Sequence, residues 1–293
     1  MQIETKFPGT DRLQGILLLL ATAVLWSTGG LGIKWVDWNP LAIAGARSAI
    51  SAIVIWTAFR GSPLRWNGAM VWGGAGYALM VVTFVVANKL TTAANAILLQ
   101  YCSPIYVAIL GAIFLREKPH LYDWLTISLV GGGMVLFFQD EMSAGGLTGN
   151  LAGIASGIGM AVMTVAMRRQ KDGSPFGSAL LGNILAFLCG LPFMFNDSPG
   201  VAGWVAIVAM GAIQMGLSYV LYSTAIKWVT ALEATIITMI EPILNPLWVF
   251  LLLGEAPGFW SLAGGGVIMV AITFRYIIPA LKSAGSVDQA GKA

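Results

Sequence analysis

Glu241 is the side chain with the clearest chemical potential, because it lies within an apolar stretch, Ile236–Trp248. A carboxyl group near the middle of a bilayer costs roughly 2.5–3.5 kcal/mol on insertion scales and usually serves function. Glu241 could bind an ammonium group or carry a coupling proton. A structural role is equally open, in which it accepts hydrogen bonds from backbone groups freed by Pro242 or pairs with Arg47.

Glu241 belongs to a polar stripe. Thr238, Glu241, Asn245 and Trp248 are spaced i, i+3, i+7 and i+10, which places them on one face of a helix. Such a face is too polar for lipid. It therefore predicts a wall of an internal cavity.

Other apolar segments carry aromatic, thioether or hydroxyl groups at helical spacing. These groups suit a substrate with an apolar body and a polar head. The same pattern also packs polar helices against one another, and cavity lining is the favoured interpretation. The further candidate cavity residues are Trp26, Tyr77, Met80, Phe84, Gln100, Ser103, Met160, Thr164, Met215, Ser218 and Tyr222.

Arg47 lies inside another apolar segment. Its planar guanidinium could bind a substrate carboxylate, but a role in helix pairing or gating is the favoured interpretation. Pro104 and Pro242 are predicted to kink their helices, which either exposes carbonyl groups to a cavity or only adjusts packing.

The chain lacks the residues that most enzymes need. It has one histidine, His120, and two cysteines, Cys102 and Cys189, which are expected to be packing residues. We find no carboxylate pair, metal-ligand cluster, P-loop or basic cluster with interleaved aromatics. We therefore expect no catalysis, no metal, no cofactor and no nucleic-acid partner.

Composition places the chain in a bilayer. Of its 293 residues 57% are hydrophobic and 10% are charged, and the mean hydropathy is +0.80. A helix needs about 20 apolar residues to cross a membrane. Ten such helices are predicted, at 13–34, 40–59, 68–88, 92–115, 121–139, 149–167, 176–195, 202–225, 231–253 and 259–280.

Basic residues predict the orientation. With the N-terminus in the cytoplasm, thirteen Lys and Arg residues lie inside and only Lys34 and Lys89 lie outside, with Arg47 set aside. This excess indicates that both termini are cytoplasmic. Residues 1–12 and 281–293 are then cytoplasmic tails, and the first apolar run is expected to be a retained helix.

The two halves of the chain are related. At an offset of 138, ten of 33 positions from Ala87 to Pro119 match an identical residue between Ala225 and Pro257. Two repeats, 13–139 and 149–280, follow. Because each repeat has five helices, the second enters the membrane from the opposite side, as in transporters that work by alternating access.

The paired prolines and the signatures Glu117-Lys118-Pro119 and Glu255-Ala256-Pro257 resemble the EamA family of the drug/metabolite transporter superfamily. The SPIY and EPILNPLW segments are most similar to bacterial YddG-type exporters of aromatic amino acids and methionine. The resemblance implies an all-α protein of ten transmembrane helices. It also implies a bacterial inner-membrane location and function as a monomer.

The leading hypothesis is a secondary exporter of small amphipathic metabolites, above all the amino acids Phe, Trp, Tyr and Met. Two alternatives in the same superfamily are a proton-coupled drug or cation exporter and an exchanger of sugars or nucleotide derivatives. The latter would need more cationic cavity residues than Arg47. A receptor or scaffold is disfavoured, because inverted repeats serve no obvious purpose there.

Overall fold

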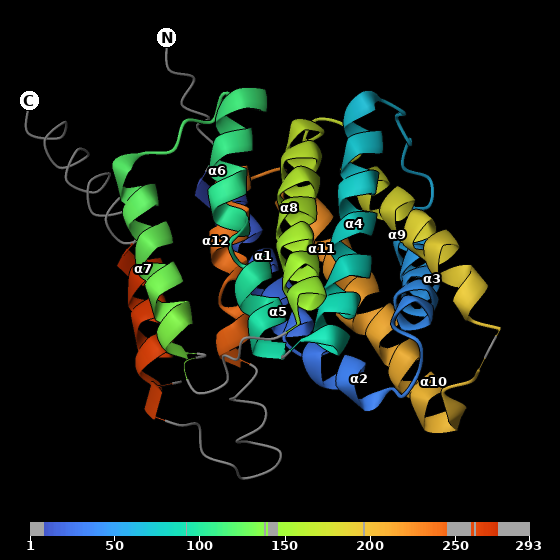
Figure 1. Ribbon diagram of the computed structural model, residues 1–293. Helices are drawn as coiled ribbons and strands as arrows, with labels where there is room; N and C mark the ends of the chain where they lie inside the picture. The colour runs from blue at the N-terminus through green and yellow to red at the C-terminus, as the bar shows by residue number, and fades with distance from the viewer. Residues whose placement is uncertain are drawn as a thin grey trace, which may run out of the picture.

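The computed structural model describes residues 9–91, 93–137, 139, 146–195, 197–244, 259–260 and 262–274. All regular elements in these ranges are helices (Figure 1). In chain order they are α1 Gly9–Trp26, α2 Gly29–Trp35, α3 Pro40–Ala58, α4 Gly68–Leu90, α5 Ala93–Gln100, α6 Ser103–Phe114, α7 Leu121–Phe137, α8 Leu147–Arg169, α9 Phe176–Gly190, the 3₁₀ helix η1 Leu191–Phe193, α10 Gly200–Ala209, the π-helix η2 Met210–Leu217, α11 Ser218–Ala225 and α12 Ala231–Thr238. A further apolar helix is Leu262–Phe274.

Six helical stretches in the described part are long and apolar enough to cross a membrane. Each therefore satisfies its own backbone groups, as hydrocarbon requires. They are Pro40–Ala58, Gly68–Leu90, Ala96–Phe114, Leu147–Arg169, Phe176–Phe193 and Gly200–Ala225.

Capping residues fix where two central helices begin. Asn39 caps α3, where its side chain accepts a hydrogen bond from the backbone N–H of Leu41 at 2.9 Å, and Pro40 follows at the start of the helix. Asn67 caps α4 in the same way. The α3 cap places Arg47 about two turns inside the helix.

The first predicted helix, 13–34, is divided into α1 and α2. The Ser27 hydroxyl donates to the carbonyl of Val24 and the Thr28 hydroxyl donates to that of Leu25. Such local bonds compete with the helical ladder, and Gly29 follows directly. The chain therefore turns at Ser27 and Thr28 before α2 begins.

The fourth predicted helix, 92–115, is also divided, into α5 and α6. The helix turns at Tyr101 and Cys102 and resumes at Ser103, with Pro104 in the first turn of α6. Proline is favoured there because it has no N–H to donate. The segment starting at Ala231 has the same design at an offset of 138. There α12 spans the residues equivalent to α5, a turn follows, and Pro242 lies just after the helix resumes.

Glycines allow α4 and α8 to approach closely at the centre of the molecule. A Cβ on Gly159 would lie 2.6 Å from the backbone nitrogen of Met80 and 2.7 Å from the oxygen of Gly76. Both distances are shorter than van der Waals contact, so only glycine fits. This approach brings Met80 and Met160 together.

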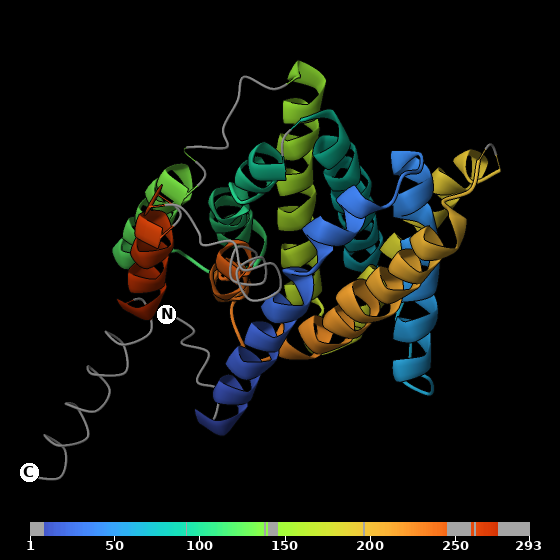
Figure 2. The same ribbon diagram turned by 90° about the horizontal axis from the view of Figure 1, so that it is seen from below.

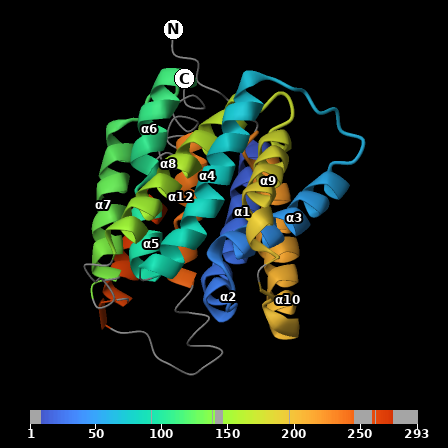
Figure 3. The same cartoon turned by 45° about the vertical axis from the view of Figure 1, so that its right-hand side comes forward.

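The remaining helices surround this pair. Figure 3 shows α3, α9 and α10 gathered on the side opposite α7. Seen from below in Figure 2, α7 and the helix Leu262–Phe274 form a pair at the other edge. Gly133 of α7 meets Ile268 and Gly264 of that helix. Gly133 and Gly264 therefore lie where these two helices pack together.

Candidate substrate cavity

A cavity lies between the two halves of the chain. Its empty volume is about 460 Å³, which includes the open solvent at its mouth. It receives side chains from α1, α3, α4, α5, α8, η2 and α11, and from the helical residues 241–244 that follow α12. The lining residues are Trp26, Arg47, Met80, Val81, Phe84, Gln100, Met160, Gln214, Met215, Tyr219 and Glu241.

Seven of the predicted cavity residues lie in this lining. They are Trp26, Met80, Phe84, Gln100, Met160, Met215 and Glu241.

An aromatic cluster forms one part of the wall. The ring of Trp26 lies 5.2 Å from that of Tyr219 and 5.5 Å from that of Tyr222, centroid to centroid. Tyr77 contacts Tyr219 edge-on at 4.6 Å. The indole N–H of Trp26 donates to the Ser218 hydroxyl at 2.8 Å. Tyr77, Ser218 and Tyr222 thus hold the cavity residues in place from behind.

Other predicted residues also act from behind the wall. The hydroxyls of Thr164 and Tyr222 lie 3.0 Å apart in a buried hydrogen bond. The Ser103 hydroxyl donates to the sulfur of Met160 at 3.6 Å. Thr238 is buried and donates to carbonyl groups of its own helix. None of these three threonine and serine side chains lines the cavity.

Two polar side chains of the lining are fixed by hydrogen bonds. The amide of Gln100 donates to the Ser156 hydroxyl at 2.7 Å, and Ser156 donates to the carbonyl of Met80 at 3.0 Å. The carboxylate of Glu241 accepts a hydrogen bond from the Tyr101 hydroxyl. This bond connects the turn between α5 and α6 to the residue that follows the equivalent turn after α12.

Two other polar side chains of the lining each have one buried atom without a hydrogen-bond partner among the described residues. Arg47 is only 3% exposed, and its Nε has no hydrogen-bond partner among the described residues. The Oε1 atom of Gln214 is buried and likewise has no partner there. The sequence favoured a pairing or gating role for Arg47, whereas the structure places the residue in the cavity wall beside Tyr77 and Tyr219.

Sequence reasoning missed Val81, Gln214 and Tyr219. It assumed α-helical periodicity for Met215, Ser218 and Tyr222, but this segment contains η2, a π-helix, which turns different side chains inward. One signal was present, since Val81 and Tyr219 are equivalent at the offset of 138. Pro104 and Pro242 lie in the turns described above, and Asn245 and Trp248 lie outside the described residues.

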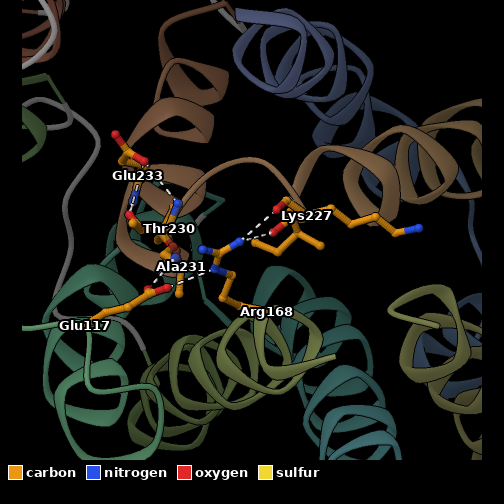
Figure 4. Close-up of polar contacts among 8 residues, drawn as sticks. Glu117, Arg168, Lys227, Thr230, Ala231 and Glu233 are labelled. Carbon is orange, nitrogen blue, oxygen red and sulfur yellow. Dashed lines mark hydrogen bonds and ion pairs between the residues drawn. The ribbon is translucent and has the colours of Figure 1, made fainter. Parts of the chain in front are cut away.

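A second polar cluster lies at the end of α6 (Figure 4). Its residues are not part of the cavity lining. Glu117 accepts a hydrogen bond from Arg168 Nε at 2.9 Å and one from the backbone N–H of Ala231 at 3.0 Å. Arg168 Nη1 also donates to the carbonyls of Ile226 and Lys227, at 3.1 and 3.0 Å. This Glu117 cluster joins the ends of α6, α8 and α11 to the start of α12.

Next to the Glu117 cluster, Thr230 and Glu233 form a capping box at the start of α12. Arg12 of α1 pairs with Glu233 at 2.6 Å. In the sequence, Arg12 and Arg168 are only two of the thirteen basic residues expected on the cytoplasmic side, because their partners are more than 50 residues away in the chain.

The EamA-like transporter family matches residues 13–139 and 147–277. The chain belongs to this family. It is therefore a multi-pass membrane transporter and not an enzyme, as the sequence predicted.

Individual relatives agree with this class. An uncharacterized transporter of Archaeoglobus fulgidus is 27% identical over 202 residues, which cover 68% of this chain and 72% of the relative. Pseudopaline exporter CntI of Pseudomonas aeruginosa is 27% identical over 238 residues, with 77% and 82% covered. One solved crystal structure superposes with a TM-score of 0.79 at 21% identity and covers 91% of this chain and 98% of its own. That likeness shows a shared fold.

Proposed function

We propose that this protein is a secondary exporter of small amphipathic metabolites, and that aromatic and other apolar amino acids (Phe, Trp, Tyr and Met) are its main substrates. The observation that carries the proposal is the composition of the cavity wall. Trp26, Tyr219 and several methionines provide an apolar surface, while Arg47 and Glu241 provide one charge of each sign. This combination matches a zwitterion with an apolar side chain.

Ten transmembrane helices in two inverted repeats, 13–139 and 149–280, are part of the proposal. The equivalent bounds of α5 and α12 and the equivalent turns after them support the repeats. In this topology the termini are cytoplasmic, the membrane is a bacterial inner membrane and a monomer suffices. The pseudopaline exporter among the relatives supports outward transport.

Alternating access gives the Glu117 cluster a role. In the proposed topology the cluster lies at the cytoplasmic end and holds α6, α8, α11 and α12 together. These helices must separate for a substrate to enter the cavity from the cytoplasm. Because buried ion pairs of this kind have two discrete states, made or broken, the cluster suits a gate.

A proton-coupled exporter of drugs or cations is the second candidate. The placement of Glu241 in the cavity wall favours it, since a carboxylate attracts organic cations and can carry a proton.

Growth of cells that overproduce the protein distinguishes the two candidates. Toxic analogues of phenylalanine, tryptophan and methionine should be tolerated better than in cells with the empty vector. Resistance to cationic dyes without resistance to the analogues would contradict the amino-acid proposal and favour the second candidate.

A further inference from the structure

Arg47 is a buried cation that forms no ion pair with a carboxylate among the described residues. A guanidinium stays charged in a protein, so its burial cannot be relieved by loss of a proton. No ion pair shorter than 4.0 Å joins Arg47 to a carboxylate in the described part of the chain. Its neighbours Tyr77 and Tyr219 carry phenol groups and no carboxylate. An unpaired buried charge is costly and is kept where it serves function.

Arg168 provides an internal comparison. It is as buried as Arg47, at 2% exposed. Its Nε donates to Glu117, and its Nη1 donates to two backbone carbonyls of the turn after α11. This is how a buried arginine that braces a fold is satisfied. The Nε of Arg47 lacks any such partner among the described residues, so bracing does not account for it.

The position of Arg47 is set by the fold. Gly211 of η2 packs directly on α3, because a Cβ there would lie 2.7 Å from the carbonyl oxygen of Arg47. The backbone is thereby fixed while the side chain reaches the cavity. Gln214, in the same π-helix, also lines the cavity and keeps an unpartnered acceptor, Oε1.

Glu241 does not neutralise Arg47. Both line the cavity without an ion pair between them, and Tyr219 is near enough to interact with each. The carboxylate of Glu241 is instead bonded to Tyr101. The cavity thus has a cationic side and an acidic side.

We propose that Arg47 binds the carboxylate of the transported molecule, and that the Oε1 atom of Gln214 accepts a hydrogen bond from its ammonium group. This inference rests on the proposed function and adds a requirement that substrates must meet. A molecule must carry a free carboxylate to be a good substrate. Phenylalanine and 3-phenylpropionate should therefore bind, whereas phenethylamine and phenylalanine methyl ester should bind poorly.

Two measurements on the full-length protein test this requirement. The first is the rise in melting temperature that each of the four compounds produces in detergent. The second is counterflow of labelled phenylalanine in proteoliposomes. The variants are Arg47→Met, which removes the charge, and Arg47→Lys, which keeps the charge but loses the planar fork. Arg60→Met is the matched control, because Arg60 follows the same helix but is exposed, outside the cavity.

Arg47→Met should weaken carboxylate binding about 10- to 150-fold, the range for hydrogen bonds to charged groups. Its melting temperature without ligand should stay equal or rise, because an unpaired buried charge has been removed. Arg47→Lys should be intermediate, and Arg60→Met should equal the wild type.

The outcomes distinguish a failure of the Arg47 carboxylate site from a failure of the proposed amino-acid transport. Equal stabilisation of the wild type by phenethylamine and 3-phenylpropionate would overturn the role of Arg47. So would a fall in the melting temperature of ligand-free Arg47→Met with carboxylate affinity retained. If 3-phenylpropionate stabilises the wild type and not Arg47→Met while phenylalanine shows no counterflow, the carboxylate site stands and the amino-acid function is wrong.

Discussion

Glu117→Gln removes one charge from the Glu117 cluster and is expected to lower stability. Glutamine keeps the shape and can still accept from Arg168 Nε through its amide oxygen. Its NH₂ group cannot accept the N–H of Ala231, which Glu117 Oε2 now accepts at 3.0 Å. The substitution therefore leaves the buried guanidinium of Arg168 without its anion. It also leaves the backbone N–H of Ala231, at the start of α12, without its acceptor.

The structure indicates the size of this effect. Removal of one partner of a buried ion pair costs about 3–5 kcal/mol. The side chain of Arg168 is 2% exposed but that of Glu117 is 23% exposed, so the lower end, about 3 kcal/mol, is expected. At about 2–4 °C per kcal/mol, the melting temperature should fall by about 6–12 °C.

The assay is thermal unfolding of the purified protein in detergent, with two comparisons. Arg12→Met, which breaks the more exposed pair with Glu233, should cost about 1 kcal/mol or less. The double variant Glu117→Leu with Arg168→Met should be more stable than Glu117→Gln, because neither charge is then left alone. A double variant whose loss of stability equals the sum of the losses of Glu117→Leu alone and Arg168→Met alone would refute this reasoning.

Three further results are expected. Glu241→Gln should weaken phenylalanine counterflow with little change in melting temperature; retained counterflow with loss of pH-driven transport would identify a proton carrier, and a lower melting temperature alone would identify a structural residue. Gly159→Ala should cost about 1–3 kcal/mol of stability through overpacking, whereas Gly131→Ala, with open space around its Cβ position, should cost almost nothing. Single cysteines at Lys89 and Lys227, on a cysteine-free background, should react with an impermeant thiol reagent from opposite sides; equal labelling from outside would contradict the inverted topology.

Helical periodicity and proline positions predicted most of the described helices and seven of the eleven residues that line the described pocket. Composition predicted membrane helices, and the repeated proline motif indicated the turns that follow Gln100 and Thr238. Met80 and Met160 were predicted from stripes on separate segments, and the structure brings them together through the close contact of Gly76 with Gly159.

Other features depend on tertiary packing and lacked a local signal. The π-helix η2 changes which residues face inward, so Tyr219 lines the cavity while Tyr222 stands behind it. The partners of Arg168 come from other helices, and only the fold shows that Arg168 is satisfied while Arg47 is not. The sequence alone does not show the partners of either arginine.

Counterflow in proteoliposomes tests the central claim most directly. The purified protein is reconstituted with internal unlabelled phenylalanine, and entry of labelled phenylalanine is measured against competing amino acids, sugars and cationic dyes. The account predicts uptake that aromatic amino acids and methionine inhibit and that sugars and dyes leave unchanged. Uptake equal to that of empty liposomes, or inhibition by dyes alone, would contradict it.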